Sequence, residues 1–135
     1  MILIAYDGSD DAKSAIEHAA SLMSGQPATV VTVWEPYLQI LTRYPSPLAL
    51  VAADAGEMDE ASRTAAHDTA EEGAALARSH GLDASARAVA REDSIVETLL
   101  AEADRTNASA IVLGSRGLGG LGSLLMGSVS HALMM

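Results

Sequence analysis

Hydrophobic positions along the chain switch between two periodicities, and this predicts strands that alternate with helices. Residues 2–6 form a nearly continuous apolar run, which is typical of a central strand covered on both faces. After the short turn at residues 7–9, apolar side chains recur at helical spacing. These positions are Ala12, Ala15, Ile16, Ala19 and Met23. The pattern therefore predicts a buried strand followed by an amphipathic helix.

Polar residues and breakers mark where this first helix begins and ends. Ser9 is a suitable N-cap, and Asp10 and Asp11 fall in the first turn, where the helix dipole favours acids. Gly25 and Pro27 predict its end. The β-branched run at residues 29–34 then predicts a second strand.

An irregular connection is expected after the second strand. Pro36, Pro45 and Pro47 interrupt residues 36–56, and the stretch is long for an ordinary turn. A lid or a contact surface is expected there.

Two further helices and two further strands complete the pattern. Residues 57–79 are rich in alanine and glutamate and stop at His80 and Gly81, as a helix does. Residues 82–89 alternate weakly and predict a strand at or near an edge. Asp93 is expected to cap a third helix, and residues 109–113 form the fourth strand. One apolar stripe of the third helix is made by Ile95, Leu99 and Ala103.

This order of elements predicts an α/β fold. Strands alternating with helices favour an open, mostly parallel sheet with helices on both faces, and 135 residues suit a single domain spanning 1–135. In such sheets ligands bind beyond the carboxyl ends of the strands, where the winding direction reverses.

Composition narrows the classes of function. The formal charge of −10 argues against a nucleic-acid partner or an anionic membrane surface. Cysteine is absent, which excludes disulfides and thiolate metal sites and fits a cytoplasmic location. The apolar run at residues 1–6 is too short for a membrane span and lacks the basic flank of a signal peptide.

A glycine-rich segment at residues 114–128 is the strongest candidate site. It follows the fourth strand and precedes a predicted helix start at Ser128 and Val129, so its backbone amides could form an anion cradle. Two better-known phosphate motifs do not fit. The Gly122 to Gly127 spacing resembles a P-loop, but Ser128 occupies the lysine position. A dinucleotide fingerprint at residues 117–122 lacks the helix, strand and acid that should follow.

The spacing Gly114-x2-Gly117-x9-Gly127-Ser128 closely resembles the ATP-binding signature of the universal stress protein family. The turn at residues 7–9, the strand ending at Trp34 and Glu35, and residues 109–117 also fall where that family places them. The resemblance extends over nearly the whole chain.

The resemblance implies a Rossmann-like fold with strands one and four as central neighbours, so that Asp7 and Gly114 face one crevice. It implies ATP as ligand, with Mg²⁺ beside Asp7 as an option, and no haem, flavin or structural metal. The small or flat side chains and backbone groups of Ala5, Tyr6 and Val33 would bracket adenine. The expected nucleotide contacts are Ala5, Tyr6, Asp7, Val33, Leu113, Gly114, Arg116, Gly117, Gly127, Ser128 and Val129.

Several of these residues have simpler interpretations. Asp7 could instead stabilise the turn at residues 7–9 or cap the first helix. Arg116 could be a solvated surface residue, and the glycine segment a plain connector. The four histidines lack metal-binding spacing, and no serine has the His-acid partners of a nucleophile.

The family usually adds a fifth strand. If the sequence ends naturally at Met135, the sheet is expected to lack this strand and the fourth strand to be an exposed edge, so self-association is expected while the usual dimer is in doubt. The leading hypothesis is a nucleotide-binding regulator or sensor of stress. Slow ATP hydrolysis or phosphoryl transfer, and a dimerisation module without nucleotide, are the alternatives.

Overall fold

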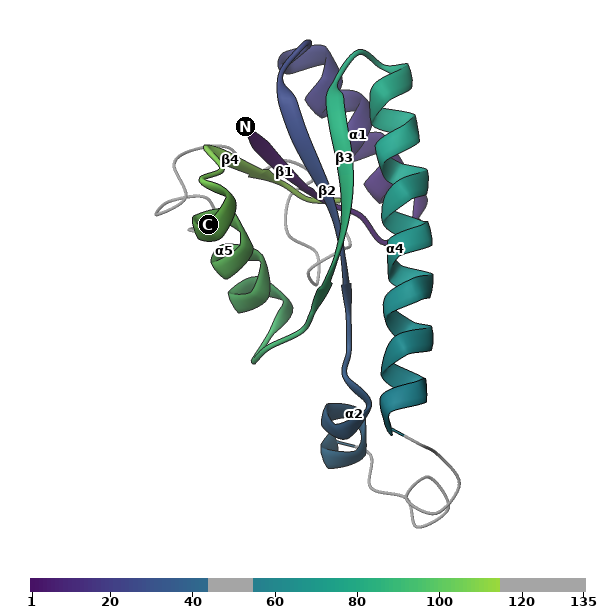
Figure 1. Ribbon diagram of the computed structural model, residues 1–135. Helices are drawn as coiled ribbons and strands as arrows, with labels where there is room; N and C mark the ends of the chain where they lie inside the picture. Colours follow the sequence, from purple (N-terminus) through teal and green to yellow (C-terminus); the bar gives the residue numbers. More distant parts are fainter. Residues whose placement is uncertain (44–54, 115–135) are drawn as a thin grey trace.

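The computed structural model describes residues 1–43 and 55–114. Strands and helices follow the predicted order, with one helix more than expected (Figure 1). The elements are β1 (Ile2–Ala5), α1 (Asp10–Leu22), β2 (Pro27–Trp34), α2 (Tyr37–Arg43), α4 (Ala55–Ser79), β3 (Asp83–Ala90), α5 (Ile95–Thr106) and β4 (Ala110–Val112).

The four described strands form one parallel sheet in the order β3-β2-β1-β4. This confirms the predicted α/β class, the neighbouring positions of the first and fourth strands, and the edge position of β3. Ile4 lies between Val30 of β2 and Val112 of β4 in the register. The stretch after Gly114, which bears on the expected missing strand, lies outside the described residues.

The helices cover both faces of the sheet because the direction of winding reverses once. Connections from β1 to β2 and from β2 to β3 run one way, whereas the connection from β3 to β4 runs back across the sheet. Right-handed crossovers then put α1 and α4 on one face and α5 on the other, as Figure 1 shows. The reversal lies between β1 and β4, which is where an open α/β sheet binds its ligand.

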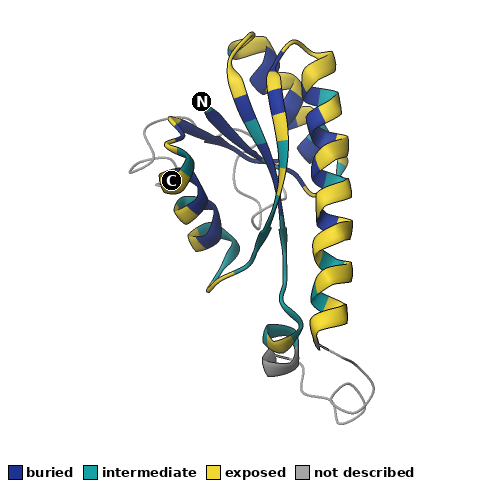
Figure 2. Ribbon diagram, in the orientation of Figure 1, coloured by how far each residue is buried: buried dark blue, intermediate teal, exposed yellow. Residues whose placement is uncertain are grey.

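Alternating side chains of β1 belong to two separate cores. Ile2 and Ile4 pack with α1 and α4, whereas Leu3 packs with Leu99 of α5. Figure 2 shows the buried residues gathered in the strands and on the helix faces that look toward the sheet. Both faces of β1 are therefore covered, as its continuous apolar sequence predicts.

Gly73 allows α4 to lie very close to the sheet. A Cβ atom at this position would lie 2.7 Å from Cδ2 of Tyr6 and 2.9 Å from Cγ1 of Val30. The remaining residues of this stripe are alanines, namely Ala66, Ala70, Ala74 and Ala77. The alanine-rich sequence of α4 thus reflects its short distance from the strands.

Serines cap the N-termini of α1 and α5, and one of these caps corrects a prediction. Ser9 caps α1 as expected, with its Oγ accepting a hydrogen bond from Ala12 N at 3.1 Å. The cap of α5 is Ser94 and not Asp93, because Ser94 Oγ accepts from Glu97 N at 3.0 Å. Asp93 and Ser94 are both good caps by residue type, so type alone does not choose between them.

Residues 36–43 also differ from the prediction. They were expected to be irregular, but Tyr37–Arg43 forms α2 after Pro36. Pro36 is compatible with this because proline is well tolerated before or within the first helical turn. Tyr37 N donates to Asp59 Oδ1 at 2.7 Å, which ties α2 to the beginning of α4.

Candidate functional site

A cleft of about 120 Å³ lies at the carboxyl ends of β1, β2 and β4, on the face that α5 covers. It therefore adjoins the point where the winding of the sheet reverses. Its lining residues are Ala5, Tyr6, Asp7, Val31, Thr32, Val33, Ile95, Leu99 and Leu113.

The walls of the cleft are mostly apolar, and one carboxylate stands at its rim. Val33, Ile95 and Leu113 contribute aliphatic side chains, and Asp7 is exposed. An apolar cavity of roughly 150 Å³ can enclose a benzene ring. A somewhat smaller cleft that is open to solvent suits one edge of a flat ring system whose remainder projects outward.

Five predicted site residues line this one cleft: Ala5, Tyr6, Asp7, Val33 and Leu113. Gly114 follows directly, is buried, and packs against the first turn of α1. A Cβ atom there would lie 2.9 Å from Ala12 N. The other predicted residues, Arg116, Gly117, Gly127, Ser128 and Val129, lie outside the described residues.

The Tyr6 side chain does not serve as the flat wall that was expected. It packs against Gly73 on the opposite face of the sheet, and its hydroxyl donates to Glu72 Oε1 at 3.1 Å. Burial, this hydrogen bond and the nearby charges of Glu72 and Asp7 raise the pKa of Tyr6 to about 12. The physical reason is strand alternation: Tyr6 shares a face with Ile2 and Ile4, away from the cleft.

The backbone of Tyr6 nevertheless forms part of the cleft floor. Its amide donates to Val31 O at 2.8 Å, and its carbonyl accepts from Thr32 Oγ1 at 2.8 Å. These two bonds continue the attachment of β1 to β2 beyond the last residue of β1. They hold the chain that leads to Asp7 in a defined position.

Asp7 has the turn role that was its simpler interpretation, and it also borders the cleft. Its Oδ1 accepts from Ser9 N at 2.9 Å across Gly8, which has φ +84. Asp7 is exposed, so its carboxylate is accessible from solvent. An ionised carboxylate only accepts hydrogen bonds, so this group suits hydroxyl or amine donors of a ligand and repels phosphate.

Four cleft residues were not predicted as site residues: Val31, Thr32, Ile95 and Leu99. Val31 and Thr32 precede the predicted Val33 in β2, so strand pairing with β1 could have indicated them. Ile95 and Leu99 were assigned to the apolar stripe of a helix. Their place at the cleft depends on the crossover from β3 to β4, which no local pattern reveals.

No group of three or more His, Cys, Asp or Glu residues that could hold a metal ion is found in residues 1–43 and 55–114. Within the same residues, no helix is both long and apolar enough to cross a membrane. Among these residues Asp7 therefore belongs to no such group.

Comparison with known proteins identifies the family. The model of the universal stress protein family matches residues 1–135. The chain belongs to this family. A Thermus aquaticus relative, a universal stress protein in the QAH/OAS sulfhydrylase 3' region, is 33% identical over 146 residues, covering 98% of this chain and 89% of the relative.

Solved structures of universal stress proteins share the fold. A member from Burkholderia pseudomallei is 26% identical with a TM-score of 0.62, covering 84% of this chain and 79% of that one. An Arabidopsis thaliana member, solved with AMP bound, is 18% identical with a TM-score of 0.52, covering 89% of this chain and 79% of that one. The second likeness, at this identity, concerns the fold alone.

Proposed function

We propose that this universal stress protein binds an adenine nucleotide in the cleft at the ends of β1, β2 and β4. The observation that carries the proposal is the meeting of Ala5, Asp7, Val33 and Leu113 around one cleft, with Gly114 next in the chain. The AMP-bound structure of an Arabidopsis thaliana family member supports the choice of ligand.

Within this proposal, each part of the nucleotide has a position that suits the chemistry of the cleft. The base contacts the aliphatic side chains of Val33, Ile95 and Leu113. The ribose hydroxyls donate to the Asp7 carboxylate, which is exposed at the rim. The phosphates lie away from Asp7, because like charges repel, and are held by the amides of the glycine-rich segment that begins at Gly114.

Within this proposal the nucleotide is ATP, and occupancy regulates the protein as a sensor in a stress response. Mg²⁺ would enter with the nucleotide, held chiefly by phosphate oxygens. A homodimer and a cytoplasmic location belong to the same proposal. Slow phosphoryl transfer would in addition need a general base, for which Asp7 is the candidate.

Titration calorimetry with ATP, ADP and AMP, each with and without Mg²⁺, tests this function. We expect saturable binding of ATP to the full chain without release of phosphate during the experiment. Phosphate release that is lost in Asp7→Asn would support the enzymatic alternative. Absence of heat with all three nucleotides would overturn the proposal.

Substitutions in the cleft and in the glycine-rich segment locate the ligand. Val33→Phe should fill the cleft and weaken binding at least tenfold, whereas Val96→Phe on α5, outside the cleft lining, should leave affinity unchanged. Replacing Gly117 and Gly127 with valine should abolish binding by blocking backbone approach to the phosphates. Thermal melting of each variant shows whether the fold is retained.

A further inference from the structure

Strand β3 presents half of its backbone hydrogen-bonding groups to the outside of the sheet. Asp83 N donates to Gln26 O at 3.1 Å and Arg91 N donates to Trp34 O at 2.7 Å, so both amides point toward the β2 side. The backbone N–H and C=O groups of successive residues in a strand point to opposite sides. The even-numbered residues of β3 therefore direct these groups away from β2. These outward residues are Ala84, Ala86, Ala88 and Ala90.

One end of this edge is covered by a side chain. Arg78 Nε donates to Ala84 O at 2.9 Å, and Arg78 Nη1 is held by Glu71 Oε1 at 3.0 Å. This contact confirms the outward direction of Ala84. Within the described part of the chain, no such partner is recorded for the outward groups of Ala86, Ala88 or Ala90.

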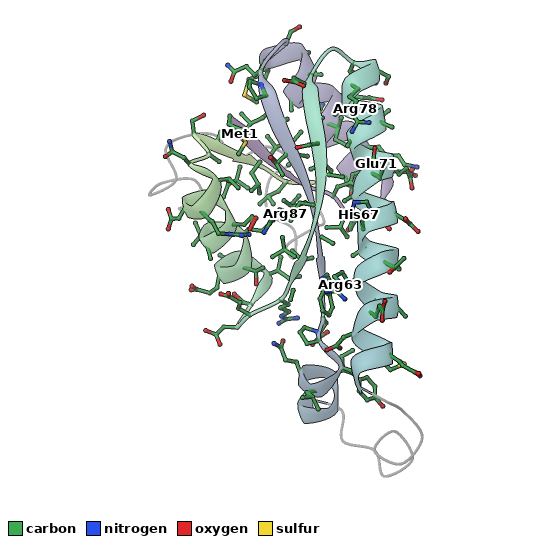
Figure 3. All side chains as sticks on the ribbon, in the orientation of Figure 1. Met1, Arg63, His67, Glu71, Arg78 and Arg87 are labelled. Atoms are coloured by element: carbon green, nitrogen blue, oxygen red, sulfur yellow. The ribbon has the colours of Figure 1, made fainter. Side chains whose placement is uncertain are left out.

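A groove of about 410 Å³ runs beside the uncovered part of β3. Arg63, Thr64 and His67 of α4 line one side of it, and residues 86–88 of β3 line the other. Figure 3 shows Arg63, His67, Glu71 and Arg78 following one flank of α4 toward β3. The groove thus combines strand backbone that has no partner within residues 1–43 and 55–114 with guanidinium, imidazole and hydroxyl side chains.

Two of the three basic residues that line the groove are available to a ligand, whereas the third, Arg87, pairs with Glu102. Arg63 and His67 are exposed, and neither forms a hydrogen bond or ion pair with any residue that the structure describes. The chain has only eight Lys and Arg residues against 18 acids. Glu57, Glu60 and Asp68 line a neighbouring surface of the same helix, which meets the groove at Thr64.

We propose that this groove binds an extended segment of a partner protein, which pairs with β3 as an additional strand and carries acidic side chains at alternate positions. The spacing supports this. Arg63 and His67 are four residues apart on a helix, which is about 6 Å. Alternate side chains of a strand share one face and are roughly 6.6 Å apart. Two acids separated by one residue would therefore meet Arg63 and His67 together.

This surface is separate from the nucleotide cleft. The cleft is lined from β1, β2, α5 and Leu113, whereas the groove lies between β3 and α4 and shares no lining residue with it. Failure of one proposal therefore leaves the other intact. Peptide binding is expected with and without ATP.

Two octapeptides of identical composition test the proposal on the full chain. The first, acetyl-Ser-Thr-Val-Asp-Thr-Asp-Val-Thr-amide, places both acids on one face of a strand. The second, acetyl-Ser-Thr-Val-Asp-Asp-Thr-Val-Thr-amide, places them on opposite faces. We expect the first to bind several-fold more tightly by titration calorimetry and to shift the backbone amide resonances of Ala86, Ala88 and Ala90.

Variants separate the backbone contribution from the charge contribution. Ala88→Pro removes an outward amide, which an edge strand tolerates, and should weaken the first peptide about tenfold or more. Arg63→Gln combined with His67→Gln should weaken it about fivefold. His18→Gln, an exposed histidine on α1, is the matched control and should have no effect. A lysine version of the first peptide should bind Arg63→Glu better than it binds the original chain.

Four results would overturn the proposal. Equal affinity of the two peptides would exclude the pairing of alternate acids with Arg63 and His67. Equal affinity of the original chain and a folded Ala88→Pro variant would exclude strand pairing. Self-association that Ala88→Pro abolishes would make a second copy of this chain the occupant. Binding of inorganic phosphate that shifts the side-chain resonances of Arg63 and His67, but not the amide resonances of β3, would identify a simple anion site.

Discussion

Gly114 lies so close to the first turn of α1 that a Cβ atom at this position would be 2.9 Å from the backbone nitrogen of Ala12. The neighbour is main chain, which cannot rotate away. The end of β4 and the beginning of α1 are therefore held together by the lack of a side chain. Because Leu113 of the cleft directly precedes Gly114, this contact also positions one wall of the cleft.

Gly114→Ala should destabilise the fold and weaken nucleotide binding together. Overpacking of this kind costs about 1–3 kcal/mol, which urea unfolding measures. Calorimetry should show weaker ATP binding, because the end of β4 must move. Gly25→Ala is the control. A Cβ there meets nothing within 4 Å, and the φ of +81 means that alanine should lower stability while leaving ATP affinity unchanged. Unchanged stability in Gly114→Ala would contradict the close approach.

Gly73→Ala should be destabilising although alanine is the better helix former. The gain in helix propensity is about 1 kcal/mol, and overpacking against the Tyr6 ring at 2.7 Å costs about 1–3 kcal/mol. Urea unfolding should therefore show a net loss. In a Tyr6→Leu background the ring is absent, so Gly73→Ala should cost less. An equal cost in both backgrounds would show that Tyr6 is not the obstacle.

The raised pKa of Tyr6 should make stability fall at high pH. The folded state keeps the phenol neutral up to about 12, whereas the unfolded chain loses the proton near 10. Between these values the unfolded state binds fewer protons, so the free energy of unfolding falls as pH rises. Below 10 the contribution is fully present. Tyr6→Phe should lose this pH-dependent component, which urea unfolding at several pH values detects.

Glu72→Gln tests whether the charge of Glu72 raises the pKa of Tyr6. It removes the charge that stabilises the protonated phenol while keeping a hydrogen-bond acceptor. Near-ultraviolet absorbance should then show the pKa of Tyr6 closer to its ordinary value. A pKa that stays near 12 in Glu72→Gln would assign the shift to the causes that remain, which are burial, the hydrogen bond and the charge of Asp7.

The sequence predicted the core elements well because each has its own local signal. The continuous apolar run of β1 and the alanine stripe of α4 indicate burial without knowledge of their neighbours. No local sequence pattern indicates which face of β1 lies toward the cleft. Tyr6 was expected beside adenine, yet its parity with Ile2 and Ile4 directs it toward α4. Ile95 reaches the cleft only through the crossover that brings α5 to the other face.

Glu102 is a buried carboxylate that pairs with Arg87 and Arg105. Arg87→Met tests how much the stability of the fold depends on this pairing. The Glu102 side chain is 1% exposed, and its Oε2 lies 2.6 Å from Arg87 Nε. Removing Arg87 leaves a buried charge with Arg105 alone, a change that costs about 1–3 kcal/mol. Thermal unfolding measures the loss. Combining Arg87→Met with Glu102→Met should recover part of it, because no buried charge is then left unpaired.

The proposed contact between Asp7 and ribose predicts a coupled loss of affinity. Asp7→Ala should weaken ATP binding, and 2′,3′-dideoxy-ATP should bind the original chain more weakly than ATP does, because each change removes one partner of the same hydrogen bonds. For Asp7→Ala the two nucleotides should bind alike, which a double-mutant cycle by calorimetry measures. Asp7 also accepts from Ser9 N, so a purely structural role would weaken both nucleotides equally. Additive losses of affinity would thus place the ribose away from Asp7. The effect of Asp7→Ala would then come from the lost hydrogen bond to Ser9 N in the turn.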